Sequence, residues 1–382
     1  NGVAISNVTV GVLPDMVVFS PDGNTVMTAN EGEPDDTYTM DPEGSISIID
    51  ISGGVASVTN SNVTTLGFAS FNSQAAALRI QGVRLFGPGA SVAQDMEPEY
   101  VAISADNTRA YVACQENNAV VIVDLVTNTI LSINALGTKD HSLPGNGLDS
   151  DRRSDEIHIA QAPFQGFYMP DAIAPYDANG NKYFITANEG DSRDYGGYSE
   201  EDRLDDLTLD PTIFPNEAEI FEAYGDIKIT TASGDIDNDG DYDVIHTYGA
   251  RSFTIWDGVT GNLVYDSGDD FEQIIKNHPE YFRLFNVADD DNVIKNRSDD
   301  KGPEPEAVTV GIVHGVPYAF IGMERTGGVM VYDITNPASP TFVEVKISRD
   351  TATGGGDQAP EGLIFIPESQ SPTNRAMLIS AN

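Results

Sequence analysis

The chain has 382 residues, of which 60 are Asp or Glu and 20 are Lys or Arg, so its formal net charge at pH 7 is −40. A charge of this sign and size disfavours nucleic acid as a partner, and it repels itself in any compact state unless salt or bound cations neutralise many carboxylates. Hydrophobic residues make up 40% of the chain, which is enough for a sizeable core and argues against intrinsic disorder.

The cysteine content and the hydropathy of the chain narrow its class further. The only cysteine, Cys114, lies in the apolar run AYVACQ, where we expect a buried, inert thiol and no intrachain disulfide. No apolar stretch reaches the ~18 residues that a membrane span needs, and no basic-then-apolar leader opens the sequence. We therefore expect a mature or trimmed fragment without a membrane span.

Five segments repeat one layout, in which a proline–acid pair opens an apolar strand, a turn follows, and a second strand runs into a polar cluster with an acid. Turn residues between the two strands predict a hairpin in each segment. In chain order the segments are LPDMVVFSPDGNTVMTANEGE (13–33), EPEYVAISADNTRAYVACQEN (97–117), MPDAIAPYDANGNKYFITANEGD (169–191), EPEAVTVGIVHGVPYAFIGMER (304–325) and APEGLIFIPESQSPTNRAMLISAN (359–382).

Third strands ending in Asp follow most hairpins, near Asp50, Asp124 and Asp333. Short antiparallel strands that recur in units of roughly 40 to 50 residues are typical of propeller blades. The sequence therefore predicts an all-β fold, a single β-propeller domain over residues 1–382. We favour seven blades, with six as the alternative.

Several segments between the repeats carry predictions of their own. Residues 227–265 resemble a further blade, and the opening GVAISNVTV is a candidate strand to close the ring onto a last blade that is otherwise truncated. Residues 139–165 and 195–219 fit no blade and predict long loops over one face. Residues 72–82, NSQAAALRIQG, predict a short surface helix.

The sharpest motif is an alternation of aspartates around a glycine, DIDNDGDYD. Calcium prefers six to eight oxygen ligands, and a Gly-enabled turn of alternating aspartates supplies them. The twelfth position is His246 rather than Glu, so the loop is not an EF-hand but is similar to the calcium loops of integrin-type propellers. An acidic turn without metal is the alternative. The candidate ligands are Asp235, Asp237, Asp239, Asp243 and, through its carbonyl, Asp241.

A second set of candidate metal ligands follows from the repeats. In an antiparallel hairpin the start of the first strand and the end of the second lie at the same edge. The repeated acids should therefore converge on the central mouth of the propeller, where like charges require bound calcium, another divalent metal or shared protons. Solvated acids at strand ends are the alternative. The residues are Asp15 with Glu31, Glu99 with Glu116, Asp171 with Glu189, Glu306 with Glu324, and Glu361.

Basic residues are scarce, and four of them stand near these acids in the sequence: Arg193, Arg251, Arg325 and Lys301. Arg beside a divalent ion commonly holds phosphoryl oxygens, so these four are candidate phosphate clamps. Ordinary ion pairing explains each of them equally well. No Gly-x-Ser-x-Gly elbow, HExxH helix, Walker loop or CxxC pair is present. The sequence therefore does not support a standard serine hydrolase, zincin, NTPase or zinc ribbon.

The motifs PDMVVFSPDG, TANEGEPDD, MEPEYVAIS, TANEGDSRDY, YGARSFTIWD and DDKGPEPEAV together resemble the choice-of-anchor I domain family. This resemblance implies a bacterial, secreted or cell-surface propeller, a label as alkaline-phosphatase-like, and a general similarity to calcium-dependent phytase propellers. The family's defining trait is attachment to the cell surface by varied anchors.

Two classes of function remain open from the sequence. One is a calcium-dependent phosphoesterase acting on a phosphorylated small molecule, with the acid ring holding metals and the four bases holding phosphate. The other is a non-catalytic surface or matrix propeller that binds glycans, proteins or sister subunits and uses calcium for rigidity. A lactonase-like hydrolase is a lesser alternative.

Overall fold

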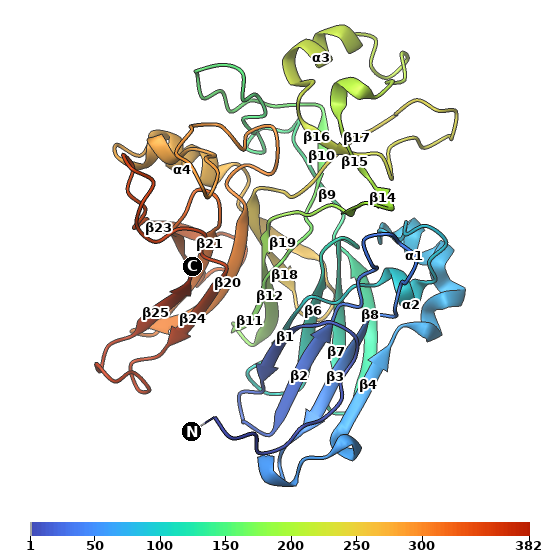
Figure 1. Cartoon of the computed structure of the whole chain (residues 1–382). Coiled ribbons are helices and arrows are strands. Elements are labelled where there is room, and N and C mark those ends of the chain that lie inside the picture. Colours follow the sequence, from blue (N-terminus) through green and yellow to red (C-terminus); the bar gives the residue numbers. More distant parts are fainter. Residues whose placement is uncertain (1) are drawn as a thin grey trace.

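The computed structural model describes residues 2–382, and four antiparallel four-stranded sheets succeed one another along the chain (Figure 1). The first strands of neighbouring sheets contact each other in the order β1, β5, β11, β20 and β24, as expected of inner strands around a common axis. The fold is an all-β propeller.

The blades have the following bounds. Blade 1 contains β1 (Pro14–Phe19), β2 (Thr25–Asn30), β3 (Ser45–Asp50) and β4 (Val63–Gly67). Blade 2 contains β5 (Tyr100–Ile103), β6 (Arg109–Cys114), β7 (Ala119–Asp124) and β8 (Thr129–Ala135). Blade 3 contains β11 (Ile173–Ala178), β12 (Asn181–Asn188), β18 (Ser252–Asp257) and β19 (Leu263–Asp266). Blade 4 contains β20 (Pro305–Val313), β21 (Val316–Met323), β22 (Val329–Asp333) and β23 (Thr341–Lys346), and a two-stranded sheet of β24 (Gly362–Ile366) and β25 (Met377–Ala381) follows.

The five proline–acid segments all form hairpins, which confirms the repeat. Pro14 lies opposite Asn30 and Pro305 opposite Met323, so each proline–acid pair starts at the edge where the second strand ends. A register shift follows the proline in both hairpins, and such bulges redirect the side chain next to them. The acid after the proline is therefore placed in a locally twisted stretch at the mouth of the blade.

Apolar faces of neighbouring blades pack against each other and form the core. Met27 and Ile46 of blade 1 pack with Val112 and Val121 of blade 2. Blades 3 and 4 share a larger cluster of buried side chains that includes α4. Cys114 is buried and free, as expected from its apolar surroundings.

The number of blades differs from the sequence prediction, because residues 227–265 do not form a blade of their own. Instead β18 pairs with β12, with Ser252 opposite Asn188, and completes blade 3 after an excursion of the chain over residues 189–251. Residues 2–382 thus contain four four-stranded blades rather than six or seven, together with smaller sheets of two or three strands. The turn signals before SFTIWD mark the end of this insertion, and not the start of a new sheet.

The insertion folds together with residues 136–168 into a small subdomain above blade 3 (Figure 1). It has a core of its own, which includes Phe164, Leu204, Ile229 and Ile245. The long loops expected over residues 139–165 and 195–219 therefore contain short strands and helices, as do the neighbouring residues of the subdomain. These are β9 (Thr138–Asp140), β10 (Phe164–Phe167), β13 (Asp194–Tyr195), β14 (Tyr198–Ser199), β15 (Glu201–Arg203), η4 (Leu204–Asp206), α3 (Glu217–Tyr224), β16 (Lys228–Thr230) and β17 (Ile245–Thr247).

Short helices cover the edges of the blades. The helix expected over residues 72–82 is present and ends at Gly82, whose φ of 98° is the left-handed geometry that favours glycine. Among the described residues, no helix is both long and apolar enough to span a membrane. The helices are η1 (Val55–Ser57), η2 (Asn60–Asn62), η3 (Ala69–Gln74), α1 (Ala75–Gln81), α2 (Val92–Asp95), α4 (Asp270–Asn277) and η5 (Tyr281–Leu284).

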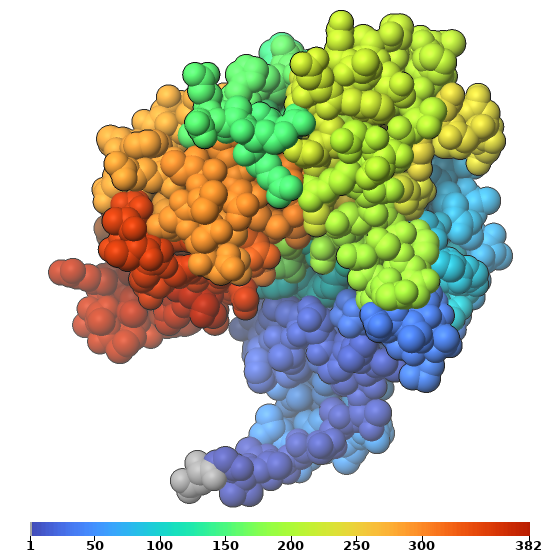
Figure 2. Space-filling view, turned by 45° about the horizontal axis from the view of Figure 1, so that its top comes forward, coloured from blue at the N-terminus to red at the C-terminus, as the bar shows by residue number. Residues whose placement is uncertain are grey.

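The opening segment does not form the closing strand that its sequence suggested. Residues 2–10 contain no strand and are mostly exposed, and the Thr9 amide donates to Oδ1 of Asn60 in blade 1. Gly11 lies directly on Asn30 and Ser45, so the segment runs over blade 1. In the space-filling view the hairpin of β24 and β25 and the first blade stay apart (Figure 2).

Candidate metal centre

Carboxylates from all four blades meet at one mouth of the propeller. Burial raises the pKa of Glu99 well above its ordinary value, and Glu116 of the same blade, Glu31 of blade 1 and Asp171 of blade 3 raise it further. Such mutual effects require that the charges lie close together. The convergence expected from hairpin geometry is therefore present in the structure.

The half of the mouth formed by blades 1 and 2 contains buried carboxylate oxygens that have no hydrogen-bond partner among the described residues. Glu99 is 7% exposed and both of its carboxylate oxygens are unpartnered, as is Oε2 of Glu116, which is 8% exposed. Burial, followed by the charges of Glu116 and Glu33, raises the pKa of Glu31 to about 8. Buried carboxylates without partners are costly unless a proton or a cation satisfies them.

The half formed by blades 3 and 4 shows the same crowding. Burial first, and then the charges of Glu189 and Asp171, raise the pKa of Glu306 to about 10. Burial and the charge of Glu304 raise the pKa of Glu324 to about 7, although Arg325 acts in the opposite direction. The pKa of Asp171 is likewise raised by burial and by Glu189.

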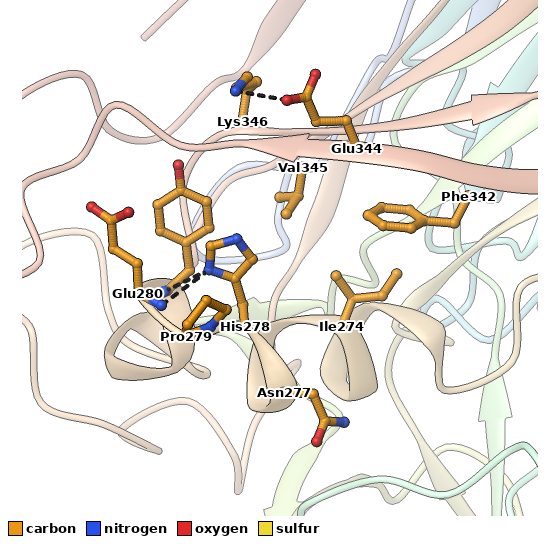
Figure 3. A pocket seen from close by; sticks show the side chains of 10 residues that line it. Ile274, Asn277, His278, Pro279, Glu280, Phe342, Glu344, Val345 and Lys346 are labelled. Atoms are coloured by element: carbon orange, nitrogen blue, oxygen red, sulfur yellow. Dashed lines mark hydrogen bonds and ion pairs between the residues drawn. The ribbon is translucent and has the colours of Figure 1, made fainter.

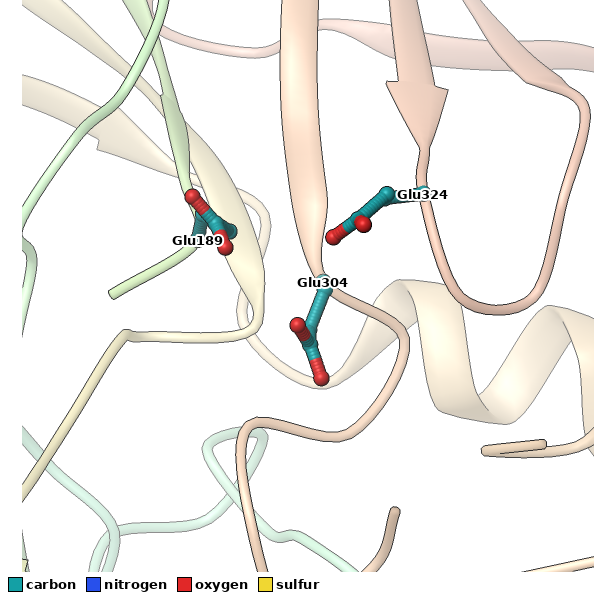
Figure 4. Close-up of side chains that lie close together, drawn as sticks. All are labelled: Glu189, Glu304 and Glu324. Carbon is teal, nitrogen blue, oxygen red and sulfur yellow. The ribbon is translucent and has the colours of Figure 1, made fainter. Parts of the chain in front are cut away.

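Two of the expected basic residues reach this half of the mouth. Nζ of Lys301 lies 2.8 Å from Oε1 of Glu189, and Nε of Arg325 lies 3.1 Å from Oε2 of Glu304. Glu189, Glu304 and Glu324 each offer an oxygen within 4.8 Å of the others, and Figure 4 shows that they come from three separate chain segments around one space. These three carboxylates could hold a cation together.

Sequence reasoning missed Glu304, which is fully buried and accepts from Arg297 as well as from Arg325. The available signal was the doubled motif Glu304-Pro-Glu306, which repeats Glu97-Pro-Glu99 of blade 2. In both blades the acid before the proline binds an arginine, and the acid after it joins the mouth.

Arg193 lies elsewhere than its expected role as a phosphate clamp requires. Its side chain is fully buried, it pairs with Asp95 and with Glu97 at 2.7 Å, and its guanidinium lies 4.6 Å from the centre of the Phe86 ring. All of these contacts are internal, so the guanidinium connects the insertion to the segment before blade 2.

Arg251 likewise makes internal contacts with its guanidinium group. It is 5% exposed, its Nη1 donates to Glu272 at 2.7 Å, and its Nη2 donates to the carbonyls of Ser298 and Asp300. Of the four bases singled out in the sequence, Lys301 and Arg325 are thus the two that the structure brings to the acidic mouth.

Glu361 is also outside the cluster. It is exposed just before β24, and its backbone amide donates to the Ala381 carbonyl. The other acids of the repeat are brought together by the contacts between β1, β5, β11 and β20, whereas the β24 hairpin ends the series.

The aspartate loop lies in the insertion, between β16 and β17. Asp235, Asp237 and Asp239 each offer an oxygen within 4.8 Å of the others, and Oδ1 of Asp235 accepts from the amide of Asp239. The remaining two aspartates of the motif face a different partner, because Asp241 and Asp243 group with Asp210. Oδ1 of Asp241 is buried and has no partner among the described residues.

Asp210 is a second residue that sequence reasoning missed. It lies in the segment between η4 and α3, and its carbonyl and side chain organise the turn that precedes α3. Nothing in the motif DIDNDGDYD points to it, because the contact joins two segments of the insertion. The backbone bond from the Asp210 amide to the Tyr242 carbonyl fixes their approach.

Four-stranded sheets arranged around a mouth lined with carboxylates define a β-propeller with an acidic central face. Within that class the chain belongs to the choice-of-anchor I domain family, whose model matches residues 1–337.

Two curated relatives are similar to parts of the chain. Gigasin-3a of Magallana gigas is 27% identical over 172 residues, which cover 41% of this chain and 59% of that protein. The mesenchyme-specific cell surface glycoprotein of Strongylocentrotus purpuratus is 27% identical over 338 residues, 75% of this chain and 42% of that protein. The matches thus span between 42% and 59% of the relatives' own lengths.

The comparison with solved structures finds only distant similarity for the two chains described here. The β-propeller domain of Cps50 (Swd1) from Myceliophteria thermophila has a TM-score of 0.31 at 11% identity, over 90% of this chain and 74% of that one. The hydrazine synthase of Kuenenia stuttgartiensis has a TM-score of 0.25 at 12% identity, over 98% and 97%.

Proposed function

We propose that this chain is an extracellular or cell-surface propeller that binds calcium, with one site at the central acidic mouth and another in the aspartate loop. The extracellular location is supported by membership of the choice-of-anchor I family and by the likeness to a cell surface glycoprotein. Calcium is the metal of choice because the candidate ligands are carboxylate oxygens, with no His or Cys among them.

The observation that carries the proposal is that the carboxylate of Glu99 is buried without a hydrogen-bond partner among the residues that the structure describes. Its two oxygens are buried and unpartnered, and the neighbouring groups that raise its pKa are all acids. A divalent cation bound by Glu99 and Glu116 would satisfy these oxygens and offset the repulsion between the two side chains, to which the charge of Glu31 adds. Protonation is the competing way to satisfy them.

Terbium luminescence distinguishes the two states, since Tb³⁺ occupies oxygen-rich calcium sites. We expect Glu99→Gln to lower the affinity of the mouth for Tb³⁺ by at least about tenfold, because a charged ligand is lost at nearly constant volume. Glu361→Gln is the matched control, since it removes the repeat acid that lies outside the cluster. Equal Tb³⁺ titrations of wild type and Glu99→Gln would mean that the buried acids are protonated and bind no metal.

A metal-dependent phosphoesterase is the second candidate, and one observation favours it. Lys301 and Arg325 stand beside Glu189 and Glu324 at the same mouth, so a metal and two cationic side chains could share one phosphoryl group. The commitment of Arg193 and Arg251 to internal ion pairs favours a binding role over catalysis.

A phosphomonoester assay at alkaline pH with added calcium tests the catalytic candidate. A phosphoesterase requires turnover that depends on metal and falls by orders of magnitude in Glu189→Gln. A binding propeller gives no turnover with any divalent metal. Activity that is undiminished in Glu189→Gln would come from another site.

A further inference from the structure

The structure has a groove beside the outermost strand of blade 4 that the metal proposal does not use. It lies between the segment from α4 to η5 and the outermost strand β23, and its volume is about 540 Å³. Figure 3 shows His278 and Ile274 on one wall facing Phe342 and Glu344 on the other. The size is within the range of small-molecule sites.

Flat rings form the apolar part of this groove. The rings of His278 and Tyr281 are stacked, with centroids 4.0 Å apart and an angle of 7° between their planes. Phe342 is 37% exposed and packs edge-on against the buried Tyr332. Both walls therefore present rigid aromatic surface rather than flexible aliphatic chains.

The orientation of His278 is fixed by the backbone. Its Nδ1 accepts from the amides of Glu280 and Tyr281, at 3.2 and 3.0 Å. An imidazole whose Nδ1 accepts carries its proton on Nε2, so the ring has a donor on its other side. A directed N–H beside a stacked pair of rings is a feature of a site with defined ligand orientation.

Polar side chains stand around the rings. Glu344 pairs with Lys346 at 2.7 Å, and Asn277 and Glu280 are exposed at the opposite wall. Carboxylate oxygens, an amide and an ammonium group together offer both donors and acceptors within one groove. A ligand that suits them has many hydroxyl groups.

We propose that this groove binds a neutral saccharide. The C–H face of a pyranose ring packs on aromatic rings, and its hydroxyl groups bond to the surrounding carboxylates, amide and His278 Nε2–H. The charge of the groove selects for a neutral sugar, because Glu280 and Glu344 outnumber Lys346 and the whole chain carries −40. Anionic sugars would be repelled.

The test uses the whole calcium-loaded chain and three tetrasaccharides: cellotetraose and chitotetraose as neutral probes and tetragalacturonate as an anionic probe. We expect isothermal titration to detect one of the neutral probes, and Tyr281→Leu to weaken its binding about tenfold by removing a flat ring at similar volume. Phe342→Ala should have the same effect from the other wall.

Phe19→Leu is the matched control, since Phe19 is an exposed aromatic residue on β1, 63% exposed and away from the groove. Its binding should equal that of the wild type. The melting temperature of each variant separates a lost contact from a lost fold. The proposal fails if neither neutral probe binds, if tetragalacturonate binds more tightly, or if folded Tyr281→Leu and Phe342→Ala both bind as the wild type does.

Discussion

Nζ of Lys301 lies 2.8 Å from Oε1 of Glu189, and this ion pair joins the segment before blade 4 to the end of the second strand of blade 3. The other carboxylate oxygen of Glu189 accepts from Gln115 of blade 2 at 2.9 Å. One glutamate thus holds three blades together at the mouth. Lys301 also lies 3.5 Å from Glu304, yet it cannot offset the acids of blades 1 and 2, whose buried oxygens stay without partners.

Calcium should therefore raise the thermal stability of the chain. A ligand that binds only the folded state adds RT ln(1 + [L]/Kd), or about 4 kcal/mol per site at a thousandfold excess over Kd. The measurement is a melting curve with calcium against one with excess chelator at equal ionic strength. Identical midpoints would show that neither the mouth nor the aspartate loop binds the ion.

The chelated protein should become less stable as the pH rises above the ordinary range of carboxyl groups. The folded-state pKa values of Glu31, Glu324 and Glu306 are raised to about 8, 7 and 10 from 4.5. A raised folded pKa contributes stability that is fully present below the unfolded pKa and is lost as the pH rises through the folded value. Urea midpoints in chelator should thus fall between about pH 5 and pH 10.

The same titration with saturating calcium provides the control, because the cation replaces the protons at the mouth. We expect a much flatter dependence on pH there. Midpoints in chelator that rise or stay level over this range would contradict the crowding of the acids.

Asp237→Ala should remove the cation of the aspartate loop without affecting the mouth. Asp235, Asp237 and Asp239 form one group in the insertion, and the loss of one charged oxygen from three weakens a calcium site strongly. Calcium titration by calorimetry should show one site fewer. Glu219→Gln, an exposed acid on α3, is the matched control, and an unchanged number of sites in Asp237→Ala would remove the loop from the metal sites.

Arg193→Ala should act on stability rather than on binding of a phosphate. The substitution leaves Asp95 and Glu97 buried without their partner, and breaking a buried pair in this way costs about 3–5 kcal/mol. Urea unfolding measures the loss. Arg153→Ala serves as the comparison, because Arg153 is about half exposed beside Asp151 and such surface pairs contribute less than about 1 kcal/mol.

The repeats made the five hairpins predictable, because each proline–acid segment carries a complete hairpin within about 20 residues of sequence. The pairing of Val17 with Thr28 follows from the turn alone. The partner of β18 was not predictable, since β12 lies on the other side of the insertion and nothing local distinguishes the third strand of an old blade from the first strand of a new one.

In the candidate site, too, the residues placed by local strand geometry were predictable, and those placed by long-range packing were not. The convergence of Glu31, Glu99 and Asp171 follows from strand geometry, which the sequence pattern encodes. The destinations of Arg193 and Arg251 depend on how the insertion packs, so proximity to an acid in the sequence was a poor guide for them. Glu304 was within reach of sequence reasoning only by comparison of its motif with that of blade 2.

The position of the insertion has a consequence for how the protein can vary. The chain leaves blade 3 after Asn188 and returns at Ser252, which is its direct partner on the neighbouring strand. The ends of the excursion are therefore held at the spacing of an ordinary hairpin whatever the excursion contains, and the entropy of closing a loop rises only slowly with its length. The aspartate loop is carried on this appendage, so the part of it between Arg193 and Arg251 could be exchanged while Glu189 and the inner strands continue to hold the acids of the mouth.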